Sequence, residues 1–233
     1  MSERRWRDIV QGRAAPHEKR RAQMLRLAAR VAVNPKVVKR DGSKKNPDIQ
    51  VQISRAMVER GRVLNELGEH KTSISSLNKA IARFKDNNKV GIQRQVADAL
   101  FYQSLNYRST RDVEGMKAVV AASTKYELTD DDNMTFTLAL TALVAADTNI
   151  AAGANSVALS LYEKVIRLAG DQSPLSDLNR ARVLSQIAIL SQNLGKVDAA
   201  TAALTALVSR YGNTDDEKIK AFVTRAKSSM VGV

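Results

Sequence analysis

The chain contains no cysteine and only two histidines among its 233 residues. Without a thiol it cannot form a disulfide, a thiolate zinc site, an iron–sulfur cluster or a cysteine nucleophile. His17 and His70 lie far apart in the sequence, and no HExxH motif is present, so no histidine-based metal site is expected. These absences exclude several large classes of metalloprotein and redox enzyme.

Proline and aromatic residues are also scarce, with four prolines and 4% aromatics. No proline lies between Pro47 and Pro174, as long helices require, because proline interrupts helical hydrogen bonding. Few aromatics disfavour a sheet-rich fold, since strands favour aromatic and β-branched side chains. Hydrophobic residues still make up 44% of the chain, which is enough for a core. The composition therefore predicts an all-α fold.

Long apolar runs are missing as well. No run approaches the roughly 18 residues that a membrane span needs, and the N-terminus lacks the apolar segment of a secretory signal. Its arginine content resembles that of a transit peptide, but Glu3, Asp8 and Glu18 and the scarcity of serine argue against that interpretation. We therefore expect a cytoplasmic protein.

Positive charge is concentrated at the N-terminus. The formal net charge is +13, and residues 1–45 contain 14 lysines and arginines against four acidic residues. We therefore divide the chain into a basic arm, residues 1–45, with one amphipathic helix after Pro16, and a nearly neutral repeat domain, residues 46–233. The cations of the arm that would attract a partner include Arg4, Arg5, Arg7, Lys19, Arg20, Arg26, Arg30, Lys36, Lys39 and Arg40.

The basic arm is compatible with four roles. It could bind nucleic acid through phosphates, with release of counterions, or an acidic protein partner. It could lie on an anionic membrane, although its apolar stripe is small. It could also only cap the first repeat, with its cations in water. Trp6 is the single aromatic residue of the arm, and no nucleic-acid-reading motif is present, so sequence-specific recognition is not expected.

An internal repeat occupies the rest of the chain. The sequence around Gly68 resembles that around Gly195, and Arg83-Phe84 is matched by Arg210-Tyr211. The offset of 127 residues is close to three units of 42, which places two further turns near residues 110 and 153. Repeats of this length are typical of stacked helix pairs.

The apolar periodicity predicts two amphipathic helices in each unit. Asp130–Asp132 is expected to cap the third pair and Ser173, before Pro174, to cap the fourth. The four pairs are predicted at about residues 48–67 and 70–86, 91–109 and 112–127, 132–150 and 154–169, and 175–193 and 196–211, followed by a capping helix at about 215–230.

Residues 48–211 resemble tetratricopeptide repeats. In the first unit, Gly61 occupies the family's small position in the first helix and Gly68 its turn position, while Ser73, Leu77 and Ala80 follow its pattern in the second helix. The fourth unit matches at Leu184, Ala188, Gly195, Ala200 and Leu204. The resemblance implies a right-handed α-α superhelix whose first helices line a concave groove.

The repeat departs from that family in its period of about 42 residues, where about 34 is usual. The aromatic residue early in the first helix and the proline at the end of the unit are also missing. HEAT-type and armadillo repeats have periods of roughly 40–47 residues. They therefore stay open as the alternative packing of the helix pairs.

No group of residues suggests catalysis. Phosphate-binding glycine motifs and the GxSxG nucleophile elbow are absent. His70 falls in a predicted turn, where a polar residue is ordinary, and Asp130–Asp132 is better explained as a helix cap than as a cation site. We expect no enzyme activity, no cofactor and no metal.

The remaining role is the binding of a protein or peptide in the predicted groove. Its guanidinium, amide and aromatic groups would suit an acidic or amphipathic segment. The family's clamp for terminal carboxylates is not expected, because Val58 and Arg62 stand at its positions. The groove residues that the resemblance implies are Arg55, Arg62, Asn65, Phe101, Tyr102, Arg108, Arg182 and Gln192. The resemblance also turns Glu66 and Asp98 toward the groove.

The sequence thus predicts a non-enzymatic scaffold or adaptor with a groove for a protein segment and a basic arm for electrostatic attachment. Two alternatives stay open. The first is a nucleic-acid-associated protein that binds phosphates through the arm. The second is a structural subunit of a larger assembly, since the ends of a repeat array are open, and oligomers are compatible with it.

Overall fold

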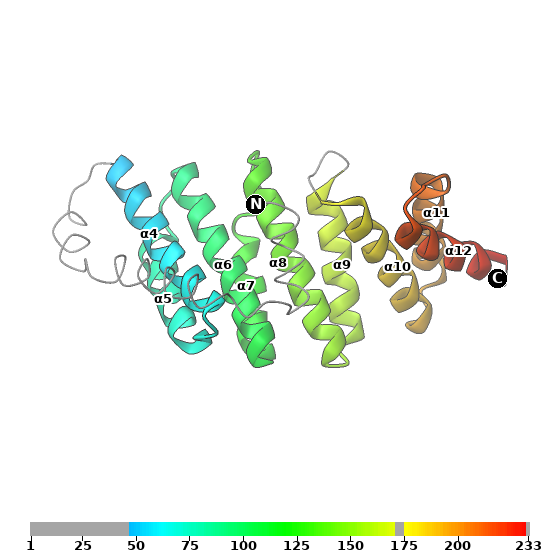
Figure 1. The fold of residues 1–233 in the computed structure, drawn as a ribbon, viewed down its shortest axis with the longest axis horizontal. Coiled ribbons are helices and arrows are strands. Elements are labelled where there is room, and N and C mark those ends of the chain that lie inside the picture. The colour runs from blue at the N-terminus through cyan, green and yellow to red at the C-terminus, as the bar shows by residue number, and fades with distance from the viewer. Residues whose placement is uncertain (1–46, 171–174, 232–233) are drawn as a thin grey trace.

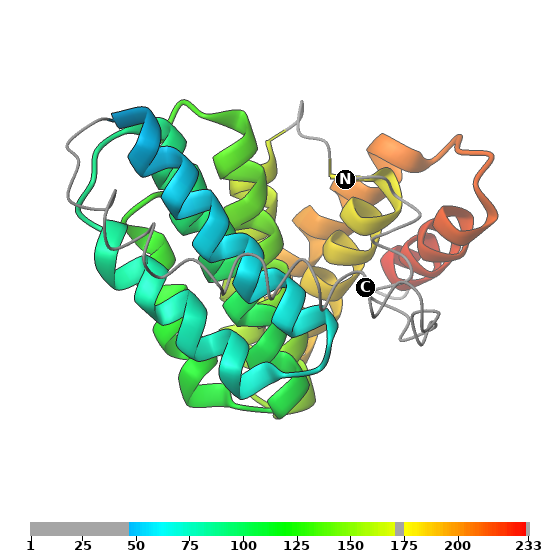
Figure 2. The same ribbon diagram turned by 60° about the vertical axis from the view of Figure 1, so that its left-hand side comes forward.

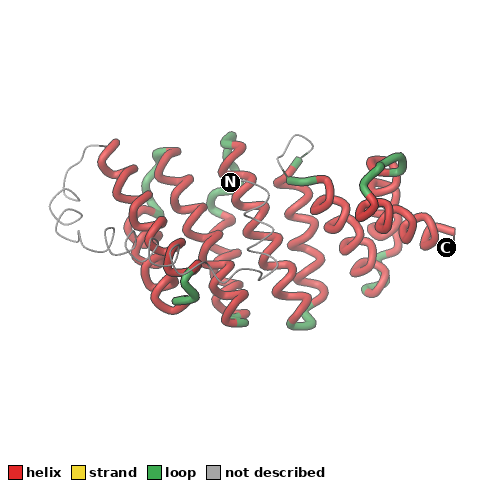
Figure 3. Tube along the Cα trace, viewed as in Figure 1, coloured by secondary structure: helices red, strands yellow, loops and turns green. Residues whose placement is uncertain are grey.

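The computed structural model describes residues 47–170 and 175–231. These residues form nine α-helices and no strand (Figure 3). The helices follow one another in chain order along the long axis of the molecule (Figure 1). The predicted all-α architecture is therefore confirmed for this part of the chain.

The helices form four pairs and a final helix. No predicted end is displaced by more than three residues, so the sequence periodicity located the elements well. The pairs are α4 (Pro47–Glu66) and α5 (His70–Phe84), α6 (Val90–Thr110) and α7 (Val113–Thr124), α8 (Asp132–Ala151) and α9 (Asn155–Ala169), and α10 (Asp177–Asn193) and α11 (Val197–Tyr211), followed by α12 (Glu217–Val231).

The turn inside each pair has the same backbone geometry. Gly68, Gly153 and Gly195 have φ of 77°, 74° and 70°, in the left-handed region that ends many helices. The second pair has Arg111 at the corresponding place, with φ of 56°. In every turn the next amide donates to a carbonyl near the end of the first helix, as from Glu69 N to Leu64 O at 2.9 Å. The turns predicted near residues 110 and 153 are confirmed.

Acidic and hydroxyl side chains cap four of the helices, α7, α8, α10 and α12. Asp131 accepts from the amide of Met134 at 2.9 Å, so the predicted acidic cap of the third pair is confirmed. The predicted cap at Ser173 is wrong, because α10 begins at Asp177 and its cap is Ser176. Leucine separates Pro174 from Ser176, so the proline precedes the helix instead of forming its first turn.

The first helices of the first three pairs pack directly on one another, α4 on α6 and α6 on α8. Each second helix packs on its own first helix, and α12 covers α10 and α11. Figure 2 turns the first pair toward the viewer, with later pairs stacked behind it. The fourth pair joins the third mainly through contacts between α9 and α10.

Gly61 allows α4 and α5 to approach closely. Ser73 on α5 donates from its hydroxyl to the carbonyl of Gly61 at 2.6 Å. A Cβ atom at Gly61 would lie 2.3 Å from Leu77 Cδ2, well inside van der Waals contact. The small residue at this position is therefore a point of close approach between the two helices.

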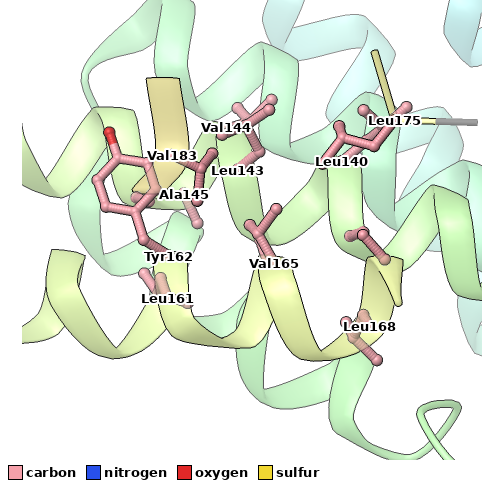
Figure 4. Close-up of a cluster of buried hydrophobic side chains, with 14 of the residues drawn as sticks. Leu140, Leu143, Val144, Ala145, Leu161, Tyr162, Val165, Leu168, Leu175 and Val183 are labelled. Atoms are coloured by element: carbon pink, nitrogen blue, oxygen red, sulfur yellow. The ribbon is translucent and has the colours of Figure 1, made fainter. Parts of the chain in front are cut away.

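One large cluster of buried hydrophobic side chains extends from α4 to α12, and a second, small cluster lies between α4, α5 and α6. Leu140, Leu143 and Val144 of α8 face Leu161 and Val165 of α9 in the central part of the large cluster (Figure 4). Among the described residues, α8 alone is long and apolar enough to cross a membrane, but 67% of its 18-residue apolar window is buried inside the structure. Its apolar character follows from its position in the core.

Candidate partner-binding face

The basic arm and its cations lie outside the described residues, which begin at Pro47. The division of the chain at residue 45 and the role of the arm therefore stay predictions. The geometry that follows concerns the first helices of the pairs.

The predicted groove residues occupy several environments. Arg55 and Gln192 are exposed, whereas Asn65 is half-buried near the end of α4. Phe101 is only 6% exposed and belongs to the core, which corrects its assignment to an open groove. Its ring lies 5.4 Å from that of Tyr102, measured between centroids. The four other residues, Arg62, Tyr102, Arg108 and Arg182, are half-buried and polar.

These four residues belong to one surface that crosses four helices. We call it the first-helix face and define it by Glu59 and Arg62 of α4, Asp98, Tyr102 and Arg108 of α6, Thr137 and Asp147 of α8, and Arg182 of α10. Contacts or electrostatic interactions connect each helix to the next on this surface, as the following paragraphs describe.

Arg62 is neutralised within its own helix. Its Nε donates to Glu59 Oε2 at 2.8 Å, and its Nη1 donates to Glu66. Burial opposes the guanidinium charge, but the two carboxylates outweigh it and raise the pKa of Arg62. Arg62 is therefore a poor candidate for binding an external anion, unlike the expectation from sequence.

Asp98 of α6 lies between α4 and α8, and only weak contacts from the described residues stabilise the negative charge of its carboxylate. Thr137 Oγ1 lies 3.5 Å from one carboxylate oxygen and Gln95 Nε2 lies 3.4 Å from the other. Burial raises the pKa of Asp98 to about 6, helped by the charge of Glu59, while Thr137 and Arg94 oppose the shift. No lysine or arginine of the described residues forms an ion pair with this carboxylate.

Tyr102 lies one helical turn after Asp98. Burial raises the pKa of its hydroxyl, and the charge of Arg62 partly offsets this effect. Its ring contacts Phe101. Within the described part of the chain the hydroxyl has no hydrogen-bond partner.

Asp147 joins three helices at the other end of the face. It accepts a hydrogen bond from the hydroxyl of Tyr162 on α9 at 2.6 Å. Arg182 on α10 donates to both carboxylate oxygens, at 3.0 and 3.3 Å. Burial and the neighbouring carboxylate raise the pKa of Tyr162. The charge of Asp147 is thus satisfied inside the protein.

Arg108 lies near this group but makes no hydrogen bond or ion pair with the described residues. Burial lowers its pKa, and only the charge of Asp147 opposes that effect. Since Arg182 and Tyr162 already engage Asp147, the guanidinium of Arg108 keeps its donors for another acceptor.

Sequence reasoning missed Asp147. A signal was available, because Asp147 is the only charged residue of α8 after its first position, Asp132, in an otherwise apolar helix. Its partners, Tyr162 and Arg182, lie 15 and 35 residues away, so their convergence depends on the packing of the pairs.

His70 belongs to a buried polar network. Its Nδ1 lies 3.0 Å from Asn106 Oδ1, and the amide of Asn106 donates to Ser73 Oγ and to the carbonyl of Tyr102. These bonds join α5 to α6, which gives His70 a structural role. Among residues 47–170 and 175–231, no cluster of three or more histidine, aspartate or glutamate side chains could hold a metal ion.

No protein-family model matches the chain, and no curated protein matches it. Among solved structures, the chain is similar to BtubC (BKLC) from P. vanneervenii, with a TM-score of 0.55 and 14% sequence identity. The match covers 93% of this chain and 92% of the other. At this identity the likeness concerns the fold alone.

Proposed function

We propose that the protein is a non-enzymatic scaffold or adaptor whose first-helix face binds a peptide or protein segment. The observation that supports this proposal most is the burial of Asp98, Tyr102 and Arg108 without compensating partners among the described residues. All three are partly desolvated, yet none has a matching partner within the described chain. Such groups cost stability, so their presence together on the first-helix face favours a binding role.

The finer architecture is part of the same proposal. The helix pairs would form a right-handed tetratricopeptide-like superhelix in which the first-helix face is concave. The repeated left-handed turns and the close approach at Gly61 support this arrangement. The period of 42 residues leaves HEAT-type packing as the alternative. We further propose a cytoplasmic location for the protein.

Affinity capture with the full chain tests the binding proposal. Arg108→Glu reverses a charge that no residue of the described chain pairs. Arg225→Glu is the matched control, because Arg225 is an exposed arginine on α12 outside the defined face. We expect Arg108→Glu to lose retained partners that the control keeps. If both variants keep the same partners, the first-helix face is not the binding surface.

The basic arm favours a second candidate function, attachment to nucleic acid. Its net charge of +10 supports this alternative, since phosphate binding releases counterions. For about 6–10 phosphate contacts, affinity should fall roughly 10³–10⁵-fold between about 50 and 200 mM salt. Loss of binding after deletion of residues 1–45 would support it, and a flat salt response would exclude it. Sedimentation at several concentrations would separate both functions from a subunit of an oligomer.

A further inference from the structure

Most charged side chains of the first helices are compensated inside the protein. Arg62 pairs with Glu59 and Glu66 on its own helix. Across helices, Arg182 of α10 pairs with Asp147 of α8. Compensation of this kind is expected, because a desolvated charge without a partner destabilises the fold.

Asp98 and Arg108 depart from this pattern with opposite signs. Asp98 has only two long polar contacts, both from neutral groups. Arg108 has no hydrogen bond within the described residues, and Asp147, whose charge stabilises it, is already bound to Arg182. Neither side chain can neutralise the other directly, because they lie ten residues apart on one helix.

The separation of the two charges follows from helix geometry. Ten residues at a rise of about 1.5 Å each give about 15 Å along α6. Their neighbours on α8, Thr137 and Asp147, are also ten residues apart, so the two helices run in parallel and both charges border the same seam. Tyr102 lies between them along the sequence, on the side of α6 that is close to the charges of Arg62 and Glu66 on α4.

From this arrangement we propose that the α6–α8 seam recognises an extended segment of a protein partner that presents a cation to Asp98 and an anion to Arg108. The proposal rests on the proposed function and names the chemistry of the partner. An extended chain covers about 15 Å in four or five residues. The segment therefore carries a lysine or arginine four or five positions from an aspartate or glutamate.

A partner of single charge sign fits this face less well. A polyanion such as nucleic acid would bring phosphates against Asp98 and Glu59. A polycation would meet Arg108 and Arg182 at the other end. Only a segment with both signs satisfies both desolvated groups, and a carboxylate can accept two parallel hydrogen bonds from the Arg108 guanidinium.

A selection experiment with the full chain tests the pairing. The probe is a random phage-displayed library of peptides of about 12 residues, long enough for the span. The native protein should enrich peptides with paired opposite charges at the stated spacing. Asp98→Asn should abolish the enrichment of cationic residues but keep that of anionic residues. Arg108→Gln should abolish the enrichment of anionic residues but keep that of cationic residues. Each change should weaken a selected peptide about tenfold or more, whereas Arg225→Gln, at an exposed arginine of α12, should change neither.

The outcomes separate the two proposals. Peptides that depend on Arg108 but show no paired charges would overturn the pairing and leave the binding face standing. The absence of any enriched peptide that depends on the face would overturn both. Thermal unfolding of each variant establishes that it is folded. Arg108→Lys is a second substitution that keeps the charge but removes the planar guanidinium, and we expect an intermediate loss of peptide affinity.

Discussion

The contact between Gly61 and Leu77 offers the sharpest test of how the pairs pack. We predict that Gly61→Ala destabilises the protein, although alanine favours helices by about 1 kcal/mol over glycine. The added Cβ would lie 2.3 Å from Leu77 Cδ2 and 2.4 Å from its Cγ. Leu77 is fully buried and cannot simply swing aside. Separation of α4 and α5 would also strain the bond from Ser73 to the Gly61 carbonyl.

The expected magnitude follows from these opposing effects. Overpacking of a core costs about 1–3 kcal/mol, and a weakened hydrogen bond costs about 0.5–1.5 kcal/mol. After subtraction of the helix propensity gain, Gly61→Ala should lower the free energy of unfolding by about 1–3 kcal/mol. Urea unfolding followed by circular dichroism measures this change directly.

Gly91 provides a matched control on another first helix. A Cβ atom there would lie 3.5 Å from Val51 Cγ2, an ordinary contact, so Gly91→Ala should be neutral or stabilising by up to about 1 kcal/mol. Leu77→Ala alone should cost about 2–5 kcal/mol. In its background Gly61→Ala should cost much less, because the colliding atoms are gone. Equal stability of the native chain and Gly61→Ala would refute the close approach of α4 and α5.

Three further substitutions test individual residues. Asp98→Asn should stabilise the protein above pH 6. The pKa of Asp98 is about 6 in the folded chain and 3.8 ordinarily, so the native protein loses stability as the pH rises from 3.8 to 6. The gain should reach at most about 3 kcal/mol and vanish below pH 3.8 in unfolding curves at several pH values. Arg111→Gly should raise the free energy of unfolding by about 1 kcal/mol, since φ of 56° disfavours a side chain; an unchanged urea midpoint would contradict this. Arg180→Met should raise the melting temperature, because Arg180 is 3% exposed and its Nε and Nη2 have no hydrogen-bond partner among the described residues; a lower melting temperature would show that the guanidinium is compensated.

The positions of the helices could be predicted because their signals are local. A glycine in the left-handed region ends a first helix at Gly68, Gly153 and Gly195, and the spacing of such residues reveals the period even where Arg111 replaces glycine. The acidic cap at Asp131 is equally local. The cap of the fourth pair was predicted at Ser173, three residues before the actual cap, Ser176.

It was harder to predict which side of each helix faces the core. Helix α6 packs against α4, α5, α7 and α8, so apolar residues on nearly every side of it are buried. Periodicity alone therefore could not place Phe101 in the core and Tyr102 on the surface. The neutralisation of Arg62 was predictable, because Glu59 and Glu66 lie three and four residues away on the same helix. The group around Asp147 was not, since its members come from α8, α9 and α10 and converge only after the third and fourth pairs have packed.

The charges of the arm and of the first-helix face differ in physical consequence. The arm is predominantly of one sign, so its attraction to a partner acts over distance, speeds association and weakens steeply with salt. Asp98 and Arg108 are partly desolvated and opposite in sign, so their electrostatic fields largely cancel at long range. Each group still lacks an oppositely charged partner at contact distance within the described chain. Contacts at such groups mainly determine how slowly a bound partner leaves. A partner that uses both surfaces would thus be attracted by the arm and selected by the face, and changes at Arg108 should alter dissociation at salt concentrations where the arm no longer contributes.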